Sequence, residues 1–559
     1  MTTATPWTSN YLHPSPWTHQ FAPLSVHEMF FRSVERMGTA SLADFMGRKY
    51  SYAEIAISVR RFAKGLQLHG IGKGDRVGLF LPNVPQYIVA YYGAMLAGAT
   101  VVNFSPLYTV DELAHQVADS GTSILVTVSA AALLPTAIKV LDQSNLGQLI
   151  VGSVAEALPR VKSWAYRLFK KADIASISAD NRVTLYADFI DNDGMPSAVS
   201  CDPEKDVALL QYTGGTTGTP KGAMLSHQNI TANARQINAI DPHSYVNAPD
   251  AATDDRILGV LPFFHVFANA TVLNRTIDNG GEIVMLPRFE ATAALKAAHR
   301  MHVTAIPGVP TMYQALLDNA ELPKTNFSAL RACISGGAPL PTELKAKFEA
   351  VSRAVLIEGY GLTESSGVIS CNPYEGENRV GSIGQPVPGT MVKLVDKEDC
   401  TKPAPDGEPG ELLCSGPQIM QGYWQQPEAT AEVFVDEFLR TGDVATIDDD
   451  GFIYIVDRLK DMISVGGFKV FPSQIEDILY RHPAVKEALV IGLFDSYLGE
   501  RPAAYVTTSE AISGADLMAW LNPQLGKHER VSAVVVRENM PKTMIGKLDR
   551  KALRAEVGT

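Results

Sequence analysis

Short apolar runs alternate with longer segments of helical period over most of the chain. The runs cover residues 77–81, 123–128, 256–261 and 354–357, and residues 86–96 have the helical period. Strands of a parallel sheet are apolar along their whole length, because crossover helices cover both faces. The pattern therefore predicts an α/β fold with stacked sheets in a large N-terminal domain.

The residue pattern changes from about residue 380, where short strand-like runs are separated by Gly and Pro. This pattern predicts an antiparallel β subdomain over about 380–457. Beyond it we expect helices at 475–480 and 514–521 and strands at 488–492 and 531–537, enough for a small α+β unit. We therefore predict an N-terminal domain over 1–457, a hinge at 458–461 and a mobile C-terminal domain over 462–559.

Composition restricts the class of protein. The 559 residues are 46% hydrophobic and 19% charged, as in a globular protein, and the net charge of −12 disfavours nucleic acid as a partner. An anionic ligand must therefore be met by local donors. The five cysteines lie far apart without a C-x-x-C pair, which argues against a disulfide framework or a zinc site and indicates a reducing compartment.

The N-terminal sequence carries no sign of export. No Lys or Arg precedes Arg32, and no continuous apolar run follows Met1. The most apolar long stretch, 87–102, is shorter than a spanning helix and contains Gly93 and Gly98. We therefore expect a cytoplasmic protein.

A Gly- and Thr-rich segment at 212–227 follows an apolar run and carries the strongest chemical signal. Gly214, Gly215 and Gly218 let backbone N–H groups approach an anion, while threonine hydroxyls and Lys221 add donors and charge. A surface loop is the alternative, but the ten-residue pattern favours a phosphate cradle. It is not a Walker A loop, because Lys221 lies between Pro220 and Gly222.

This segment resembles the phosphate loop of the adenylate-forming superfamily, which includes acyl-CoA synthetases, luciferases and peptide-synthetase adenylation domains. Further motifs follow in that family's order: 336–339 beside adenine, 358–364 for adenine and magnesium, 440–443 for ribose, 457–461 as hinge, 466–472 as thiolation loop and 541–547 with the catalytic lysine. The resemblance runs from about residue 25 to the C-terminus. It implies ATP, Mg²⁺ and coenzyme A as ligands.

The resemblance assigns roles residue by residue. The ATP/AMP site comprises Thr213, Gly214, Gly215, Thr216, Thr217, Gly218, Lys221, Gly337, Ala338, Pro339, Glu358, Gly359, Tyr360, Gly361, Leu362, Thr363, Asp443, Arg458 and Lys547. Catalysis is assigned to Lys547, Lys221, Thr363, Glu364 and His265, and Mg²⁺ to Glu364 and Thr216. The acyl pocket comprises His265, Val266, Phe267 and Asn269, the coenzyme A site comprises Gly466, Gly467, Phe468 and Lys469, and the hinge is Lys460.

The chemistry of adenylation asks for these residue types. A carboxylate attacks the α-phosphorus of ATP while pyrophosphate leaves, so fixed cations such as Lys547 and Lys221 stabilise the growing negative charge. Glu364 offers a hard oxygen to Mg²⁺, with Thr363 beside it as a hydroxyl donor to phosphate; a helix N-cap is the purely structural explanation for this pair.

The remaining polar candidates also have structural explanations. Asp443 can accept from both ribose hydroxyls or be an Asx-turn residue, and Arg458 can contact ribose or phosphate or form a surface ion pair. Tyr360 can stack on adenine or be a buried strand-end tyrosine. His265 is assigned substrate positioning and not proton transfer, and a histidine satisfied within the core would have the same sequence surroundings.

The two half-reactions need different approaches to the acyl group. By resemblance, the C-terminal domain presents Lys547 for adenylation and then pivots near Lys460, which brings Gly466, Gly467 and Phe468 to the thiol tunnel.

The closest resemblance is to bacterial long-chain fatty acyl-CoA synthetases, notably at 102–108, 372–374 and 381–388. Some of these have a gating tryptophan just after the histidine motif, but here 267–269 reads Phe-Ala-Asn, so medium-chain and dicarboxylic acids stay open. An aryl-acid ligase, a carrier-loading ligase, luciferase-type oxidation and a non-enzymatic fatty-acid-binding or uptake protein stay open as well. The intact catalytic positions argue against the binding or uptake protein.

Two assembly questions stay open in the sequence. Residues 160–171 predict a basic helix with Val161, Trp164 and Leu168 on one face, suited either to a membrane surface or to packing on the protein. By analogy with the family, a homodimer is one assembly that the resemblance allows.

Overall fold

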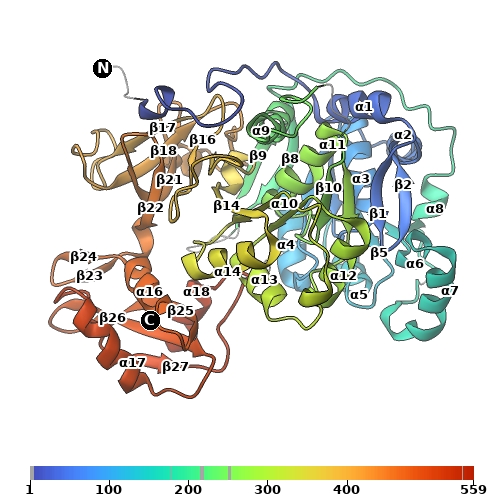
Figure 1. The fold of residues 1–559 in the computed structure, drawn as a ribbon. Coiled ribbons are helices and arrows are strands. Elements are labelled where there is room, and N and C mark those ends of the chain that lie inside the picture. The colour runs from blue at the N-terminus through green and yellow to red at the C-terminus, as the bar shows by residue number, and fades with distance from the viewer. Residues whose placement is uncertain (1–4, 178, 214–219, 250–252, 544–545, 559) are drawn as a thin grey trace.

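The fold comes from a computed structural model that describes residues 5–177, 179–213, 220–249, 253–543 and 546–558. Two large mixed sheets with covering helices make up most of the molecule, followed along the chain by two smaller five-stranded sheets (Figure 1). The predicted α/β class with a large N-terminal and a smaller C-terminal part is confirmed.

The eight-stranded sheet has the order β19-β9-β8-β4-β3-β5-β6-β7, parallel from β8 to β7. Its longest apolar helix, α3 (Pro85–Leu96), is buried over eleven of its twelve residues, which explains why that stretch is apolar without spanning a membrane. The strands are β3 (Arg76–Leu79), β4 (Thr100–Asn103), β5 (Ile124–Val128), β6 (Gln148–Gly152), β7 (Val183–Leu185), β8 (Val207–Tyr212), β9 (Gly222–Ser226) and β19 (Gly422–Tyr423).

The nine-stranded sheet has the order β16-β15-β14-β13-β12-β10-β11-β1-β2, with a parallel centre from β14 to β1 and antiparallel edges. Its strands are β1 (Ser41–Phe45), β2 (Arg48–Ser51), β10 (Arg256–Gly259), β11 (Glu282–Met285), β12 (Ala305–Gly308), β13 (Ala332–Gly336), β14 (Val355–Tyr360), β15 (Ser370–Cys371) and β16 (Gln385–Pro386). Parallel strands end at a common edge, so the residues after β13 and β14 lie side by side.

Helices cover both large sheets. They include α1 (Val26–Met37), α2 (Tyr52–Leu68), α4 (Val110–Ser120), α5 (Leu134–Gln143), α9 (His227–Ile240), α12 (Ala291–Met301), α13 (Pro310–Leu317) and α14 (Thr342–Ser352). Among the described residues, no helix combines the length and apolar character needed to cross a bilayer.

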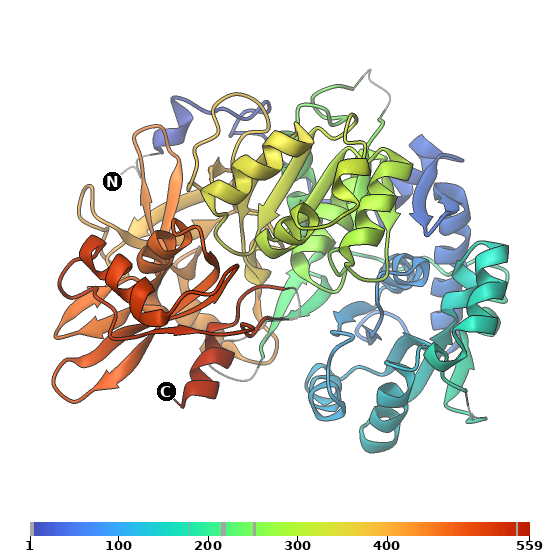
Figure 2. The ribbon, with the colours of Figure 1, turned by 60° about the horizontal axis from the view of Figure 1, so that its bottom comes forward.

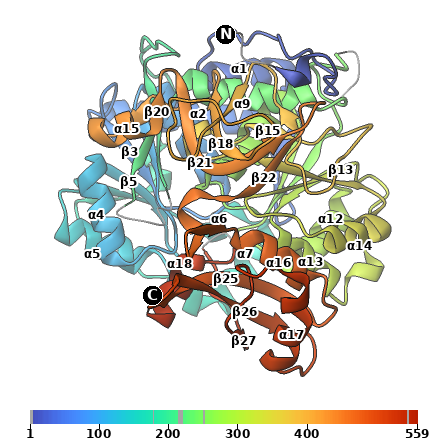
Figure 3. The ribbon, with the colours of Figure 1, turned by 90° about the vertical axis from the view of Figure 1, so that its left-hand side faces the viewer.

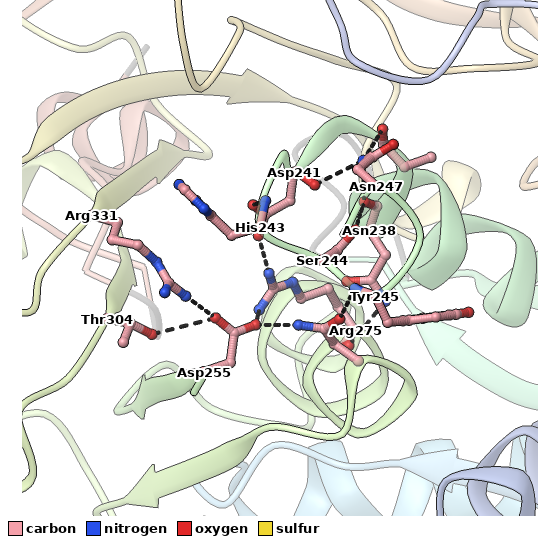
Figure 4. Close-up of polar contacts among 12 residues, drawn as sticks. Asn238, Asp241, His243, Ser244, Tyr245, Asn247, Asp255, Arg275, Thr304 and Arg331 are labelled. Atoms are coloured by element: carbon pink, nitrogen blue, oxygen red, sulfur yellow. Dashed lines mark hydrogen bonds and ion pairs between the residues drawn. The ribbon is translucent and has the colours of Figure 1, made fainter. Parts of the chain in front are cut away.

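A buried ion-pair cluster fixes the helical segment that follows His265 (Figure 4). This segment runs through α10 (Val266–Ala268), a π-helical turn η3 (Asn269–Asn274) and α11 (Arg275–Asn279). The Arg275 guanidinium pairs with Asp241 and, at 2.7 Å, with Asp255, whose other oxygen pairs with Arg331. The cluster lies at the amino ends of β10 and β13, opposite the strand ends considered below.

The smaller sheets are antiparallel apart from β27, which runs parallel to β26. The first contains β17 (Met391–Val395), β18 (Gly410–Ser415), β20 (Phe434–Val435), β21 (Phe438–Ile447) and β22 (Ile453–Arg458). After the short turn η6 (Leu459–Asp461), the second contains β23 (Ile463–Val465), β24 (Phe468–Val470), β25 (Val485–Asp495), β26 (Gly499–Thr508) and β27 (Val534–Val536), with α16 (Pro472–Tyr480), α17 (Gly514–Leu521) and α18 (Arg550–Val557).

This last part, which we call the C-terminal unit (residues 462–558), has apolar cores of its own, including Ile475, Leu479, Val490 and Leu517. Figures 1 and 3 show it beyond β22, with α16 and α18 nearest the large sheets, and Figure 2 shows its helices from below.

Candidate active site

Asp443 joins two parts of the predicted nucleotide site. It lies on β21 directly opposite Arg458 on β22, and its Oδ1 is 3.0 Å from Arg458 Nε. Tyr360, the last residue of β14, donates its hydroxyl hydrogen to Asp443 Oδ2. The Asp443 side chain is 3% exposed, and its charge raises the pKa of Arg458. A carboxylate has more than two acceptor sites, so Asp443 can hold Arg458 and still accept from ribose hydroxyls.

Lys547 approaches the loop after β13. A Cβ atom built on Gly337 would lie 2.3 Å from Lys547 Cε, and Gly337 has φ +82°, so both space and backbone favour glycine there. Burial, together with the charge of Arg458, lowers the pKa of Lys547 to about 8, while Asp443 acts in the opposite direction. The structure thus brings Lys547, Gly337, Arg458 and Asp443 to one place.

Hydrogen bonds within the turn that carries Lys547, and one from the large domain, fix the position of this turn. Within the turn, Gly546 N donates to Thr543 O at 2.9 Å and Thr543 N donates to Lys547 O at 2.7 Å. Across to the large domain, Thr311 Oγ1 donates to Gly546 O at 2.9 Å. Thr311 lies on α13 and did not figure among the predicted residues.

His265 belongs to the same neighbourhood, because the charge of Lys547 adds to burial in lowering the pKa of His265 to about 3. Its Nδ1 accepts from Phe267 N at 3.3 Å and so caps α10. A neutral imidazole of this kind orients groups by hydrogen bonding and carries no positive charge near neutral pH.

The other predicted acyl-pocket residues follow His265 along the helical segment. Phe267 packs beside Gly336, where an added Cβ would lie 3.0 Å from its ring. Val266 and Asn269 are buried, and Asn269 Oδ1 accepts from Tyr91 Oη at 3.1 Å. The π-helical turn begins at Asn269, and such turns are frequent at functional sites.

Glu364 and Lys221 come together through Tyr423, which the sequence did not point out. Tyr423 donates its hydroxyl hydrogen to Glu364 Oε1 at 2.7 Å, and Lys221 Nζ lies 5.0 Å from the centre of the Tyr423 ring. Tyr423 reaches this place because β19 pairs with β9, although almost 200 residues separate the two strands. Only its position in a short Gly-Tyr-Trp run could have drawn attention to it.

The predicted adenine residues flank two adjacent strand ends. Gly336 pairs with Gly359 in parallel register, so Gly337, Ala338 and Pro339 follow one strand beside the end of the other. Glu358 Oε1 accepts from Leu340 N at 3.2 Å, and burial raises the pKa of Glu358 to about 8. A Cβ on Gly361 would collide with Gly367 O at 1.5 Å, so this turn requires glycine. Leu362 and Thr363 continue into the turn that carries Glu364.

The predicted phosphate cradle can be followed only at its ends. Thr213 N donates to Lys221 O at 2.9 Å, which continues the β8–β9 hairpin. The predicted residues Gly214, Gly215, Thr216, Thr217 and Gly218 lie outside the described residues.

The structure does not bring the predicted coenzyme A residues to this cluster. Gly466 and Gly467, with φ +57° and +87°, make the turn between β23 and β24, and Phe468 and Lys469 follow on β24. Figure 1 shows this turn on the outer side of the C-terminal unit, whereas α18, just after Lys547, faces the large sheets. Lys460 lies in η6 between the two parts, and burial lowers its pKa.

Comparisons with known proteins fit this arrangement. The family described as AMP-binding enzyme matches residues 30–424, and its C-terminal domain matches residues 474–547. A long-chain-fatty-acid–CoA ligase from Bacillus subtilis is 37% identical over 99% of this chain and 98% of its own length. A feruloyl-CoA synthase from Amycolatopsis sp is 35% identical over 92% of this chain and 95% of its own length.

A solved structure is also similar. ATP-bound MatB from Rhodopseudomonas palustris superimposes with a TM-score of 0.82 at 26% identity, over 95% of this chain and 99% of that one. The chain belongs to the AMP-binding enzyme family. Use of ATP and coenzyme A fits an AMP-forming ligase of this family.

Proposed function

We propose that this protein is an ATP-dependent acyl-CoA synthetase that converts a fatty acid, of medium to long chain, to its acyl-AMP and then to its acyl-CoA. The observation that supports it most is the convergence of Lys547, His265 and the Asp443–Arg458 pair beside the ends of β13 and β14. These groups can hold a nucleoside, orient a carboxylate and neutralise an α-phosphate in one place.

In the first half-reaction a carboxylate oxygen forms a bond to the α-phosphorus and the bond to pyrophosphate breaks. Asp443 would accept from the ribose hydroxyls, and Tyr360 would lie against the adenine. Lys547 and Arg458 would face the negative charge that develops at the α-phosphate, while Lys221 would hold the departing phosphates. His265 would orient the carboxylate, since burial keeps its ring neutral.

The donor set fits Mg²⁺ in the manner usual for nucleotide sites, with one protein carboxylate and most of the remaining ligands from phosphates and water. Glu364 would supply that carboxylate, with Thr216 as a second protein ligand. When bound, Mg²⁺ neutralises phosphate charge during transfer. Among the described residues, no group of three or more His, Cys, Asp or Glu side chains is suited to hold a metal by itself.

The second half-reaction transfers the acyl group to the thiol of coenzyme A and releases AMP. We propose that the C-terminal domain (462–559) pivots at 458–461 relative to residues 1–457, so that Gly466, Gly467, Phe468 and Lys469 take the place of Lys547.

Ion pairs on both sides of Lys460 support this pivot. Arg458 is paired with Asp443, whereas Asp461 is paired with Arg550 at 3.2 Å and Arg554 at 3.0 Å, both in the C-terminal unit. A dihedral change would therefore concentrate at Leu459 and Lys460.

Pyrophosphate release across a carboxylate panel tests the function. The panel would run from acetate to C18 acids and include dicarboxylates and cinnamates, each with ATP, Mg²⁺ and either coenzyme A or none. Turnover that depends on coenzyme A and peaks with fatty acids supports the proposal. A peak with dicarboxylates or aryl acids would point to a ligase for those acids. Pyrophosphate release without a thioester would point to a carrier-loading ligase, and no turnover would point to a binding protein.

We also propose that helix α7 (Arg160–Phe169) contacts the membrane surface where fatty acids partition. None of its residues is buried, and its apolar side chains Val161, Trp164 and Phe169 are 79%, 65% and 75% exposed. Such a helix with flanking lysines suits an anionic bilayer. Charge reversal of Lys170 and Lys171 should reduce binding to anionic liposomes at fixed salt, and unaltered binding would contradict the proposal. Cytoplasmic location and a homodimer stay predictions, the latter to be checked by analytical ultracentrifugation.

A further inference from the structure

Asp119, near the end of helix α4, forms hydrogen bonds to two aromatic residues from distant parts of the chain. Its Oδ2 accepts from the Tyr212 hydroxyl, and its backbone carbonyl accepts from Trp424 Nε1 at 3.1 Å. Tyr212 is the last residue of β8, and Trp424 directly follows β19. One residue thus connects a helix with two strands of the eight-stranded sheet.

Both aromatic residues contact Gly222, which directly follows Lys221. Tyr212 lies opposite Gly222 in the antiparallel register of β8 and β9. A Cβ atom built on Gly222 would lie 3.4 Å from the Tyr212 ring and 3.5 Å from Trp424 Cβ, and Trp424 N donates to Gly222 O at 2.8 Å. The backbone that leaves Lys221 is therefore held by the two residues that Asp119 binds.

Contacts with two further residues place Lys221 itself. Thr213 N donates to Lys221 O at 2.9 Å, and Lys221 N donates to Thr213 Oγ1 at 3.4 Å. The Tyr423 ring has its centre 5.0 Å from Lys221 Nζ. Thr213 directly follows Tyr212 in the chain, and Tyr423 directly precedes the tryptophan. The backbone and the ammonium group of Lys221 therefore both contact chain neighbours of the two aromatic residues.

Hydrogen bonds fix the end of α4 to the eight-stranded sheet. Arg76, the first residue of β3, donates from Nε to Ser120 O at 2.9 Å and from Nη2 to Gly121 O at 2.8 Å. Burial and the hydrogen bond to Asp119 raise the pKa of Tyr212, so the Tyr212 hydroxyl keeps the proton that it donates. A hydrogen bond to a charged acceptor stabilises more than a neutral one does. The bond from Tyr212 to Asp119 therefore restrains the start of the phosphate segment.

We propose that Asp119 is a positioning residue for Lys221. Through its two aromatic partners, Asp119 fixes the backbone on both sides of the phosphate segment and so holds the Lys221 ammonium group where the departing phosphates of ATP need a cation. This rests on the proposed function, in which Lys221 holds those phosphates. The effect of Asp119 is confined to adenylation, because acyl-AMP, the substrate of the thiolation step, carries no β- or γ-phosphate.

Removal of the hydrogen bond from either side tests this role. In Asp119→Ala and in Tyr212→Phe, the kcat/KM for ATP in acyl-AMP formation should fall about 10- to 100-fold, because a small misplacement of a charged group costs on that scale. Asp119→Asn keeps a side-chain oxygen as acceptor and should restore most of this loss. Conversion of supplied acyl-AMP to acyl-CoA should stay within about twofold of wild type in all three variants. Asp111→Ala, which removes an exposed carboxylate from the other end of α4, is the matched control and should leave both steps unchanged.

A double variant separates positioning from general support of the fold. If Asp119 acts through Lys221, Asp119→Ala should lower adenylation by less than about twofold in a Lys221→Ala background, because the group that it positions is gone. The full loss in that background overturns the proposal, and so does an equal loss in thiolation. Unchanged ATP kinetics in Tyr212→Phe also overturns it, even if Asp119→Ala fails to fold. A wild-type protein that forms no acyl-AMP from any fatty acid overturns the proposed function itself.

Discussion

Replacement of Lys547 by alanine should separate the two half-reactions. Lys547 reaches Gly337 from a separate unit and lies near Arg458, so in the proposed function its ammonium group would be the cation that the C-terminal unit delivers to the nucleotide. Loss of one preorganised group of this kind typically costs about 10²–10³ in rate, or about 3–4 kcal/mol of transition-state stabilisation. We therefore expect acyl-AMP formation to fall at least 100-fold.

The thiolation half-reaction should survive the same change. Helix α18, which begins shortly after Lys547, and strands β23 and β24, which flank the loop at 466–468, lie on different sides of the C-terminal unit (Figure 1). A supplied acyl-AMP should therefore be converted to acyl-CoA at near the wild-type rate. The assays are pyrophosphate release for the first step and thioester formation from synthetic acyl-AMP for the second. Equal losses in both steps would refute the pivot.

The pH dependence of adenylation gives a second, independent test of the role of Lys547. Lowering the pKa of Lys547 from 10.5 to about 8 corresponds to about 3 kcal/mol of cost for the charged form at its docked place. Lys547 is therefore mostly charged at pH 7 and mostly neutral at pH 9. The kcat/KM for ATP, which reports the free enzyme, should fall up to tenfold per pH unit above about 8.

A rise in pH has opposite effects on the docking of the C-terminal unit and on the charge of Lys547. A lysine with a lowered pKa binds fewer protons when docked, so docking of the C-terminal unit becomes more favourable as pH rises from about 8 towards 10.5, while the docked lysine loses its charge. ATP phosphates should raise this pKa again and shift the fall in kcat to higher pH. In Lys547→Arg the fall above pH 8 should disappear, and a profile unchanged by this substitution would contradict the assignment.

Three further substitutions have defined outcomes. Arg275→Ala leaves Asp241 and Asp255 buried without their common partner and should reduce the free energy of unfolding by about 3–5 kcal/mol in urea titration. Gly337→Ala places a Cβ against Lys547 at a positive φ and should slow adenylation at least tenfold, with little change in thiolation of supplied acyl-AMP. Tyr423→Phe removes the 2.7 Å hydrogen bond to Glu364 but keeps a ring under Lys221. It should therefore raise the Mg²⁺ concentration for half-maximal adenylation several-fold. An unchanged Mg²⁺ dependence would contradict the assignment of Glu364 as a Mg²⁺ ligand.

The fold was predictable where the signal was local. The apolar runs at 123–128 and 256–261 became β5 (Ile124–Val128) and β10 (Arg256–Gly259), and the periodic segment 514–521 became α17 (Gly514–Leu521). In buried parallel strands and amphipathic helices, the surroundings of each position decide whether its residue is apolar or polar. The pattern of apolar positions is therefore enough to find these elements.

The contacts that complete the site are not local. Tyr423 meets Glu364 because a two-residue strand joins the edge of the eight-stranded sheet, and a strand that short leaves no periodic pattern. Thr311 meets Gly546 across 235 residues. The exposed side of helix α7 could not be decided from the sequence either, since the same amphipathic pattern serves a protein core and a membrane surface.

The C-terminal unit connects these observations physically. Its sheet and helices share apolar cores, so in the proposed pivot Lys547 and the Gly466–Phe468 turn would move together as one body. While Lys547 lies beside Gly337, the turn between β23 and β24 lies on the outer side of the C-terminal unit (Figure 1), and Phe468 is 59% exposed. On the proposed function, rotation at Lys460 would replace Lys547 at the acyl-AMP by this turn, so one short linker would serve two different chemical steps.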